Sequence, residues 1–502
     1  MLPEVLCIAF GIIVLIRWII YRKYNYWQRR GIECVTATFP YGSLEKCFLI
    51  EKTIGETLAE FYRNTNGKQL VGFYSPFEPM LLIKDPELIK LILVKEFNNF
   101  HDNGFVMSKD VDPLLGNNPF SIRGLQEWKH VRGIHTPTQS LARIKNFIPN
   151  LAKVAENFVK YLCNKNGEPV EMKTTSRYFT VDSVAICAFG IESDSFFDGN
   201  SSLKEYTNGE LFGTSSEGNC ACLSALFLPP IIDKIFRWRT MSKKVERFFI
   251  EMVKTIINHR KNNCIERNDL IQHLMVLDDK ANLEQSKRFT DSELAAHCMT
   301  FFIDGVETSS SFLTFTLFEI AANIDIQNKL RNEIKSIIKD ENVINMDYDK
   351  LCSLNYLDSV LSESLRKYPL VNFLSRICIR ETTINGLNIQ PGIKLFIPTL
   401  GLHMDPEYYP QPEKFLPERF SNENRTKLNK FVYLPFGEGP RICLGYKFAL
   451  TQVKMAIVTL LLNFHLDLPA EDKGKTSLEF DANSLFLVTA KGDVNIVFKS
   501  IK

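Results

Sequence analysis

The sequence predicts an α+β protein that is mainly helical, carries small β-sheets and begins with one transmembrane helix. Apolar residues recur at helical spacing through most of residues 128–340. Short runs rich in β-branched and aromatic residues lie on both sides of this helical region. Nearly all of the first twenty residues are apolar. Because the strands flank the helices and do not alternate with them, we expect one α+β domain with no parallel repeat.

Composition excludes several classes of protein. Of 502 residues, 45% are hydrophobic and 24% are charged, which is an ordinary globular balance. The formal charge of +2 gives no reason to expect a nucleic-acid partner. Twelve cysteines are scattered without the spacing of a disulfide framework or a zinc site, which favours a reducing compartment.

The N-terminus predicts a membrane anchor. Residues 2–21 are long enough to cross a bilayer as a helix, although Glu4 and Arg17 interrupt them. A basic and aromatic cluster follows and, by the positive-inside rule, leaves the rest of the chain in the cytosol. The sequence thus divides into an anchor over 1–21, a basic linker over 22–45 and a folded domain over 46–502. A cleaved signal peptide is the alternative, but it would carry its basic residues before the apolar run.

The first part of the folded domain predicts a hairpin and then a helix. Residues 68–74 and 80–84 are two strand-like runs separated by a Ser-Pro turn. Asp85 and Pro86 are typical of the first turn of a helix, as N-cap and first helical residue. Farther along, residues 223–235 form an apolar run around two prolines, which is either a buried loop or a second membrane contact.

A long apolar helix is expected over 291–323, and strands follow it. Residues 382–384 and 389 flank an Asn-Gly pair, the strongest short signal for a hairpin turn. Further strands are expected over 393–397, 484–489 and 494–498.

Residues 436–445, with the sequence Phe-Gly-Glu-Gly-Pro-Arg-Ile-Cys-Leu-Gly, carry the strongest chemical signal. Cys443 lies between glycines, and Gly439 and Gly445 can adopt backbone angles closed to other residues, so the loop can wrap the sulfur. A thiolate held this way can bind a metal. Arg441 has no local partner and suits the carboxylates of an anionic cofactor. The alternative is an ordinary buried thiol.

The long helix carries a second signal, Asp-Gly-Val-Glu-Thr, at residues 304–308. Asp304 and Thr308 are four residues apart and share one helix face, so they would form a polar notch in an apolar wall. A carboxylate there must raise its pKa or find a partner. We hypothesise that Asp304 narrows a pocket and favours substrates with a donor or a positive charge. In the alternative, it points sideways to a neighbouring polar group.

These motifs and two others resemble those of the cytochrome P450 family. The pattern F-x-x-G-x-R-x-C-x-G is similar to the haem-binding loop of that family, and W-x-x-x-R at residues 128–132 is similar to its propionate-binding helix. The resemblance implies that Cys443 is the axial thiolate ligand of haem b iron. It also implies that the other cofactor-binding residues are Phe436, Arg441, Trp128, Arg132 and Arg376. Related sequences often carry another arginine where this chain has Asn103.

The resemblance also assigns roles away from the cysteine. Thr308 and Glu307 would deliver protons to the reacting oxygen, whereas Asp304 departs from the alanine or glycine usual in the family. Glu363 and Arg366, in the E-x-x-R pattern, and Arg419 would form a buried ion network. His403 and His297 could also be considered as haem ligands, but both are better explained as hydrogen-bonded histidines.

The implied function is that of a microsomal monooxygenase. Electrons from NADPH would arrive through a flavoprotein reductase, with cytochrome b5 as a second partner, and the catalytic domain would face the cytosol from the endoplasmic reticulum membrane. Candidate reductase contacts are Lys129, Arg143, Lys145 and Lys447, unless this basic face is simply solvated. The amino-acid sequence at residues 307–309 and 417–420 is similar to that of insect detoxification members of the family.

The expected substrate is small and lipophilic, and hydroxylation or epoxidation of a xenobiotic, steroid, terpenoid or fatty acid would suit the family. The predicted pocket residues are Phe301, Phe302, Asp304, Val371, Phe373 and Phe486. Two other functions stay open: a haem-thiolate isomerase or dehydratase, and a non-catalytic haem protein that binds a ligand. The presence of Glu307 and Thr308 argues against the first of these.

Overall fold

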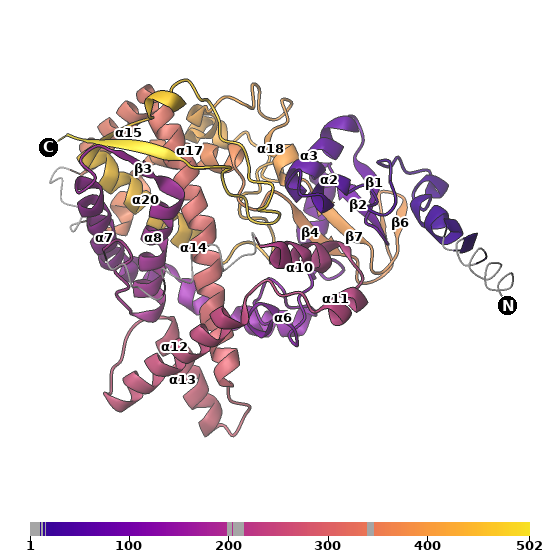
Figure 1. Ribbon diagram of the computed structural model, residues 1–502, viewed down its shortest axis with the longest axis horizontal. Helices are drawn as coiled ribbons and strands as arrows, with labels where there is room; N and C mark the ends of the chain where they lie inside the picture. The colour runs from indigo at the N-terminus through magenta and orange to yellow at the C-terminus, as the bar shows by residue number, and fades with distance from the viewer. Residues whose placement is uncertain are drawn as a thin grey trace, which may run out of the picture.

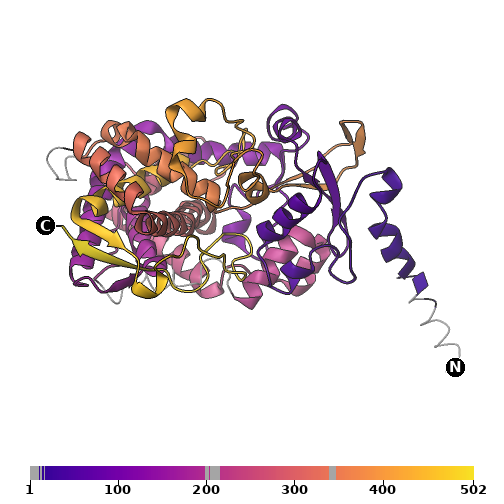
Figure 2. The ribbon, with the colours of Figure 1, turned by 90° about the horizontal axis from the view of Figure 1, so that it is seen from above.

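The computed structural model describes residues 11, 14, 15, 17–197, 203, 215–338 and 346–501. One long helix, α14 (Asp291–Ala322), runs through the middle of the molecule, and other helices lie beside it (Figure 1). Seen from above, α14 is viewed almost end-on within the ring of its neighbours (Figure 2). A Thr290 and Glu293 capping box begins this helix, and Asn323 ends it. The predicted helix over 291–323 is confirmed.

The helices that pack on α14 come from distant parts of the chain. They are α5 (Pro113–Gly116), α8 (Met172–Val184), α12 (Lys243–Asn262), α13 (Leu270–Leu283), α15 (Ile324–Ile337), α17 (Asn355–Lys367) and α20 (Tyr446–Asn463). The other α-helices are α2 (Glu45–Phe48), α3 (Ile54–Asn64), α4 (Pro86–Lys90), α6 (Leu125–His135), α7 (Leu141–Cys163), α10 (Ser216–Phe227), α11 (Pro230–Phe236), α16 (Tyr348–Ser353), α18 (Thr399–His403) and α19 (Asn422–Arg425). Short 3-10 or π turns are η1 (Gln28–Arg30), η2 (Leu91–Lys95), η3 (Thr136–Gln139), η4 (Ala185–Phe189), η6 (Pro417–Phe420) and η7 (Ala470–Asp472).

Three small sheets complete the fold. The largest has the strand order β1-β2-β7-β4, with β1 antiparallel to β2, β2 parallel to β7 and β7 antiparallel to β4. A second sheet has the order β3-β9-β8, and β5 pairs with β6 alone. The strands are β1 (Leu70–Tyr74), β2 (Pro79–Ile83), β3 (Pro169–Glu171), β4 (Leu374–Ile377), β5 (Thr382–Ile384), β6 (Leu387–Ile389), β7 (Lys394–Ile397), β8 (Phe464–Asp467) and β9 (Asn495–Ser500).

Most of the local predictions are confirmed. The β1–β2 hairpin forms, and the Asp85 side chain accepts from the Leu88 amide at 2.9 Å to cap α4. Asn385 and Gly386 both have positive φ, as a tight turn between β5 and β6 requires. The strand predicted over 484–489 is wrong: Leu487 alone makes a bridge, to Val371, because the backbone bonds of this segment go to separate places, such as the Leu370 carbonyl for Val488 and the Asp481 amide for Thr489.

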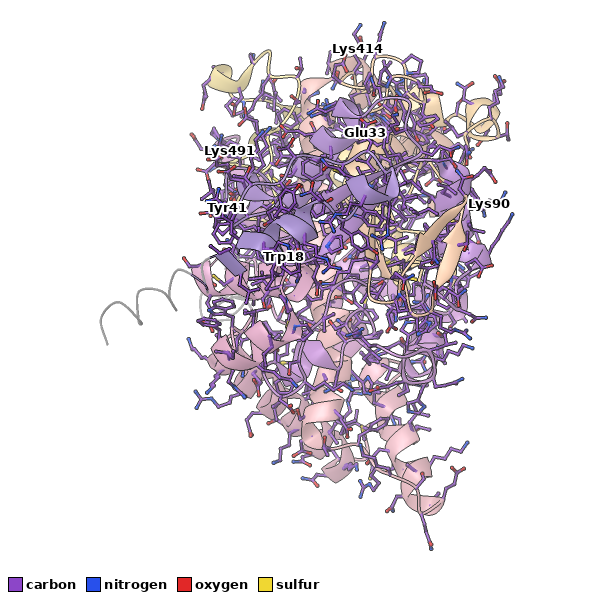
Figure 3. The ribbon with its side chains drawn as sticks, turned by 90° about the vertical axis from the view of Figure 1, so that its right-hand side faces the viewer. Trp18, Glu33, Tyr41, Lys90, Lys414 and Lys491 are labelled. Atoms are coloured by element: carbon purple, nitrogen blue, oxygen red, sulfur yellow. The ribbon has the colours of Figure 1, made fainter. Side chains whose placement is uncertain are left out.

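Most of the predicted transmembrane segment, residues 1–21, lies outside the described residues. Within the described ranges, no helix combines the length and the apolar character needed to span a bilayer. The part of this segment that is described is helical and exposed, and Figure 3 shows Trp18 at the surface on that side of the molecule. Within residues 22–45, the predicted linker, Trp27 is fully buried.

Candidate active site

One interior cavity of about 300 Å³ gathers most of the residues that the sequence singled out. Its walls come from α6, α14, the strand β4 and the loop before α20. The predicted site residues that line it are Trp128, Arg132, Phe301, Asp304, Thr308, Val371, Arg376, Phe436, Arg441, Cys443 and Phe486. The folded chain therefore brings together residues that are up to 358 positions apart, from Trp128 to Phe486.

The loop around Cys443 is shaped by two glycines. Gly437 and Gly439 have φ of +72° and +80°, and a Cβ on Gly439 would lie 2.2 Å from the Leu93 carbonyl oxygen. The Cys443 amide donates to the Phe436 carbonyl at 2.8 Å, which closes the loop. Gly445 does not use the backbone freedom that glycine offers: its φ is −87°, and it directly precedes the first turn of α20.

The thiol of Cys443 faces the cavity and forms no disulfide. Its pKa is raised to about 11, chiefly by burial and also by the nearby Asp304 carboxyl, although the Gly445 amide and Arg132 oppose the shift. A thiolate at neutral pH therefore needs a cation bound at the sulfur. Among the described residues, no group of three or more histidine, cysteine or acidic side chains could hold a metal ion.

Three arginines surround one end of the cavity. Arg132 donates to the Ile442 carbonyl at 2.7 Å, and Arg441 donates to two carbonyls of the loop before α6 at 3.2 and 3.0 Å. Arg376 donates to the Asn103 side chain at 2.9 Å. Asn103 therefore orients Arg376 and does not itself supply a cation.

The charge of these arginines is only partly compensated. Burial lowers the pKa of Arg376 to about 10 and that of Arg441 to about 9, and the second value also reflects repulsion from Arg376. The Nε atoms of Arg376 and Arg441 are buried and have no hydrogen-bond partner. Asp102 lies 3.8 Å from Arg441 and is the one carboxylate paired with it in the described ranges. An anionic group in the cavity would neutralise the remaining positive charge and accept hydrogen bonds from the unpaired Nε atoms.

Trp128 holds two of these arginines in place. Its ring lies under the guanidinium groups of Arg132, at 5.5 Å, and Arg441, at 4.7 Å. Cation–π contacts of this kind fix planar cations where few acceptors are present. Trp128 and Arg132 come from the same face of α6, as their spacing predicted.

The opposite wall carries the polar notch formed by Asp304 and Thr308. The Thr308 hydroxyl donates to the Asp304 carbonyl at 2.5 Å, so its oxygen keeps lone pairs for a donor in the cavity. α14 continues without a break through this turn, and the notch is made by side chains alone. The Asp304 carboxylate accepts from the Asn118 amide at 3.3 and 3.4 Å. It thus has a neighbouring polar partner and still faces the cavity.

Glu307 lies on the other face of the helix and does not line the cavity. It forms an ion pair with Arg177 of α8, with an N–O distance of 3.2 Å, and it is buried. Successive helical residues point about 100° apart, which explains why Glu307 and its neighbour Thr308 meet different surroundings. The structure therefore places the predicted acid behind the notch.

Two predicted pocket residues also lie outside the cavity walls. Phe302 is fully buried between Phe189 and Phe249, with ring centroids 5.9 and 5.1 Å away, because it projects from the far side of α14. Phe373 packs behind Phe486 at 5.8 Å. It supports the wall without forming part of it.

The two histidines have hydrogen-bond partners, as the sequence interpretation expected. His403 contacts the Arg366 carbonyl at 3.2 Å and accepts from the Leu434 amide at 2.9 Å. His297 contacts His135, ring nitrogen to ring nitrogen, at 3.0 Å. Neither histidine lines the cavity, although His135 does.

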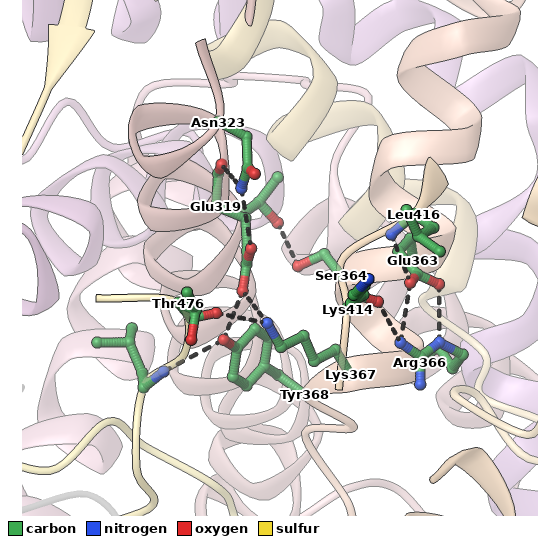
Figure 4. A network of polar contacts seen from close by, with 12 residues as sticks. Glu319, Asn323, Glu363, Ser364, Arg366, Lys367, Tyr368, Lys414, Leu416 and Thr476 are labelled. Atoms are coloured by element: carbon green, nitrogen blue, oxygen red, sulfur yellow. Dashed lines mark hydrogen bonds and ion pairs between the residues drawn. The ribbon is translucent and has the colours of Figure 1, made fainter. Parts of the chain in front are cut away.

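Behind the cysteine loop lies an ion network centred on Glu363 (Figure 4). Arg366 binds the Glu363 carboxylate through two hydrogen bonds of 2.7 and 2.8 Å, and Arg419 lies 3.3 Å from it. Glu363 and Arg366 are fully buried. Arg366 also donates to the carbonyls of His403 and Pro412, so this network, the Glu363 network, joins α17 to the segment that leads into the cysteine loop.

A second buried network next to it was not predicted. Glu319 of α14 accepts from Lys367 at 2.8 Å and from the Tyr368 hydroxyl at 2.6 Å (Figure 4). Lys367 also donates to the Thr476 carbonyl. Burial raises the pKa of Glu319, and Lys367 opposes that shift. The sequence offered a signal only in the basic residue beside Arg366.

Comparison with known proteins agrees with this geometry. A family model described as Cytochrome P450 matches residues 46–496. Cytochrome P450 6j1 of Blattella germanica is 34% identical over 450 residues, which cover 89% of this chain and 88% of that protein. Probable cytochrome P450 6a20 of Drosophila melanogaster is 31% identical over 502 residues, covering 97% and 98%. Cytochrome P450 6k1 of Blattella germanica is 33% identical over 490 residues, covering 94% and 92%. The chain therefore belongs to the cytochrome P450 family of haem-thiolate monooxygenases and is related to members from insects.

Proposed function

We propose that the protein is a membrane-anchored haem-thiolate monooxygenase that hydroxylates or epoxidises a small lipophilic substrate with electrons from NADPH. The observation that carries this proposal is one cavity with a free thiol, three arginines and a polar helical notch on its walls. The electrons would come through a flavoprotein reductase, and cytochrome b5 would be a second donor. The endoplasmic reticulum membrane is the expected location.

The residues present fit a haem. Cys443 would hold the iron, and Arg132, Arg376 and Arg441 would bind the propionates, for which the unpaired Nε atoms are available. When bound, haem supplies the activation of O2 and the transfer of one oxygen atom to the substrate. Phe436 and Trp128 would pack beside the cofactor, since both line the cavity.

Side chains of the protein would direct proton transfer in the cavity. The Thr308 oxygen can accept a hydrogen bond from a water in the cavity while its hydroxyl proton is donated in a hydrogen bond to the Asp304 carbonyl. Glu307 would act from behind the helix, where its ion pair with Arg177 holds the carboxylate in place. We assign Thr308 as the residue that touches the reacting atoms and Glu307 as a positioning residue.

A membrane surface is supported by exposed apolar residues of α11. Ile231, Ile235 and Phe236 of α11 are 58%, 64% and 58% exposed, and Lys234 lies among them. Residues 223–227 end the buried helix α10 and residues 230–235 lie in α11, so the buried loop that was one interpretation of residues 223–235 does not form. Apolar side chains with a neighbouring lysine suit insertion at the lipid headgroup boundary.

Reductase binding is proposed on the side of the cysteine loop. Lys129 is exposed on α6, the helix whose Arg132 contacts the loop. Arg143 and Lys145 begin α7, but each already has a partner, the Asp269 carbonyl and the Asp349 carboxylate. Lys447 is half-buried at the start of α20. Lys129 is therefore the strongest candidate for contact with an acidic partner.

Reconstitution tests the function directly. The full chain in lipid vesicles with a microsomal reductase is expected to oxidise a lipophilic compound only when NADPH and O2 are both present. Conversion of a peroxide without NADPH would indicate the isomerase alternative. Ligand binding with no product under any of these conditions would indicate a non-catalytic binding protein.

Loss of the Arg376 charge is expected to weaken haem retention. Arg376→Gln removes a charge-assisted contact worth about 1.5–3 kcal/mol, so haem should dissociate roughly ten to a hundred times faster. Transfer of haem to an excess of scavenging apoprotein measures this rate by absorbance. Arg123→Gln is the control, because Arg123 is about half exposed and lies outside the cavity. Equal dissociation rates for the two variants would contradict the assignment.

Removal of the Thr308 hydroxyl is expected to uncouple the reaction. Thr308→Val should lower product formed per NADPH by roughly a hundredfold, the usual scale for a positioned proton-transfer group, while NADPH consumption continues. Thr314→Val is a matched control on the same helix, because its hydroxyl makes the same bond to the carbonyl four residues earlier but lies away from the cavity. Product yield that is equal in both variants would remove Thr308 from the mechanism.

A further inference from the structure

We propose that this cavity selects lipophilic molecules with a cationic nitrogen, which Asp304 binds as counter-ion and three phenylalanines surround. The inference rests on the proposed function, because it names the class of substrate for the same site. It draws on a feature of the cavity that the proposed oxidative chemistry leaves unused, a carboxylate in a largely apolar wall.

Asp304 lacks a cationic partner. Its hydrogen-bond donor is the neutral Asn118 amide, and within the described ranges no lysine, arginine or histidine lies within ion-pair distance of it. Burial raises its pKa to about 7, although the hydrogen bond from Asn118 opposes this shift. A positive charge brought into the cavity would restore the stabilisation that water gives an exposed carboxylate. A neutral hydrocarbon would only remove water from it.

Asn118 holds the carboxylate toward the cavity. Its amide nitrogen donates to Asp304, while its amide oxygen accepts from the Phe120 backbone at 2.7 Å. Asn118 is 4% exposed, so both bonds are made inside the protein. The carboxylate is therefore fixed by a residue that belongs to the same loop as one of the aromatic side chains.

Three aromatic rings form a continuous surface on the cavity wall. Phe105, Phe120 and Phe486 contact one another with centroid distances of 5.7, 5.2 and 5.5 Å, and all three line the cavity. Ring faces attract cations, and aromatic surfaces are a common means of recognising quaternary ammonium groups. A carboxylate joined through Asn118 to an aromatic surface combines the two contacts that an organic cation requires.

The three arginines of the cavity bond to groups other than the Asp304 carboxylate. Arg132, Arg376 and Arg441 donate to carbonyls or to Asn103, and in the proposed function they face the propionates of the cofactor. They therefore do not compete for the Asp304 carboxylate. The cavity is basic where the cofactor would bind and acidic at Asp304, so a substrate cation has one attractive place in it.

A pair of isosteric probes tests the inference in the holoenzyme. One probe is a phenylbutyl trimethylammonium salt, and the other is the neutral hydrocarbon in which a tert-butyl group replaces the trimethylammonium group. A quaternary nitrogen has no lone pair and cannot ligate iron, so any preference comes from the protein. Equilibrium dialysis is expected to show the cation binding about ten to a hundredfold tighter than its isostere.

Variants locate the source of this preference. Asp304→Asn keeps the shape and the bond to Asn118, and it is expected to abolish the preference for the cation while leaving affinity for the hydrocarbon unchanged. Asp291→Asn removes the same charge from an exposed place on the same helix and is the matched control. Phe486→Leu should weaken cation binding by about two to fivefold and affect the hydrocarbon less. Haem content and thermal unfolding confirm that each variant is folded.

Equal affinity for the two probes in the wild type, or a cation preference that survives Asp304→Asn, would overturn the inference. The proposed function is judged separately, by NADPH-dependent oxidation of neutral lipophilic compounds. Oxidation of those compounds together with equal probe affinities would reject the substrate class and keep the monooxygenase. Strong cation preference without any NADPH-dependent product would reject the monooxygenase function and keep the ligand class.

Discussion

Serine in place of Cys443 is expected to abolish the red-shifted Soret band that thiolate-ligated haem shows when the protein is reduced and exposed to carbon monoxide. The shift depends on electron donation by sulfur to the iron, and a serine hydroxyl stays protonated and donates far less. Monooxygenase activity should be lost with the band. The measurement is a difference spectrum of the purified protein before and after carbon monoxide.

The control for this substitution is Cys220→Ser. Cys220 is half-buried on α10 and does not line the cavity, so the band should persist in that variant. Far-UV circular dichroism shows whether Cys443→Ser keeps its helices. A folded Cys443→Ser protein that retains the band would contradict the assignment of Cys443 as the ligand, and so would loss of the band in both variants.

Local sequence patterns predicted the parts of the site that are close together in the chain. The Cys443 loop, the Trp128 and Arg132 pair and the Glu363 and Arg366 pair each span ten residues or fewer, so the spacing alone places them on one loop or one helix face. The hairpin turns and helix caps were predictable for the same reason. Each follows from the conformations that a few neighbouring residues allow.

Contacts between distant residues could not be predicted in this way. Asn118 and Asp304 are 186 residues apart, and Glu319 and Lys367 are 48 apart, so no short pattern contains either pair. Helix periodicity also does not say which apolar face meets a cavity and which meets another helix, and Phe302 was assigned to the pocket although it packs away from it. These features depend on how the helices pack around α14.

The sequence also could not tell which glycines of the cysteine loop adopt an unusual backbone. Glycine permits a left-handed backbone but does not require it, and the sequence around the cysteine contains several glycines. Only Gly437 and Gly439 adopt positive φ, and only at Gly439 would a side chain collide with the backbone of η2. Knowing which glycine is constrained requires knowing what lies beside it.

Glu363→Gln is expected to lower the free energy of unfolding by about 3–5 kcal/mol, because it leaves the buried Arg366 without its anion. Arg366 is fully buried, and its carbonyl partners solvate the cation without neutralising it. Arg419 loses the same carboxylate, which adds to the cost. Because the Glu363 network leads into the cysteine loop, the variant should also lose haem more readily. Urea unfolding followed by circular dichroism measures the stability difference.

The chain contains a matched surface pair that isolates the effect of burial. Glu87 and Lys90 are also three residues apart and lie 3.2 Å from each other, but their side chains are 68% and 36% exposed. Glu87→Gln should therefore cost about 1 kcal/mol or less, since water stabilises the lysine that remains. Equal losses of stability in Glu363→Gln and Glu87→Gln would show that the spacing of the pair matters and its burial does not. A loss confined to Glu363→Gln would instead show that the fold relies on this carboxylate to keep two arginines buried beside the cysteine loop.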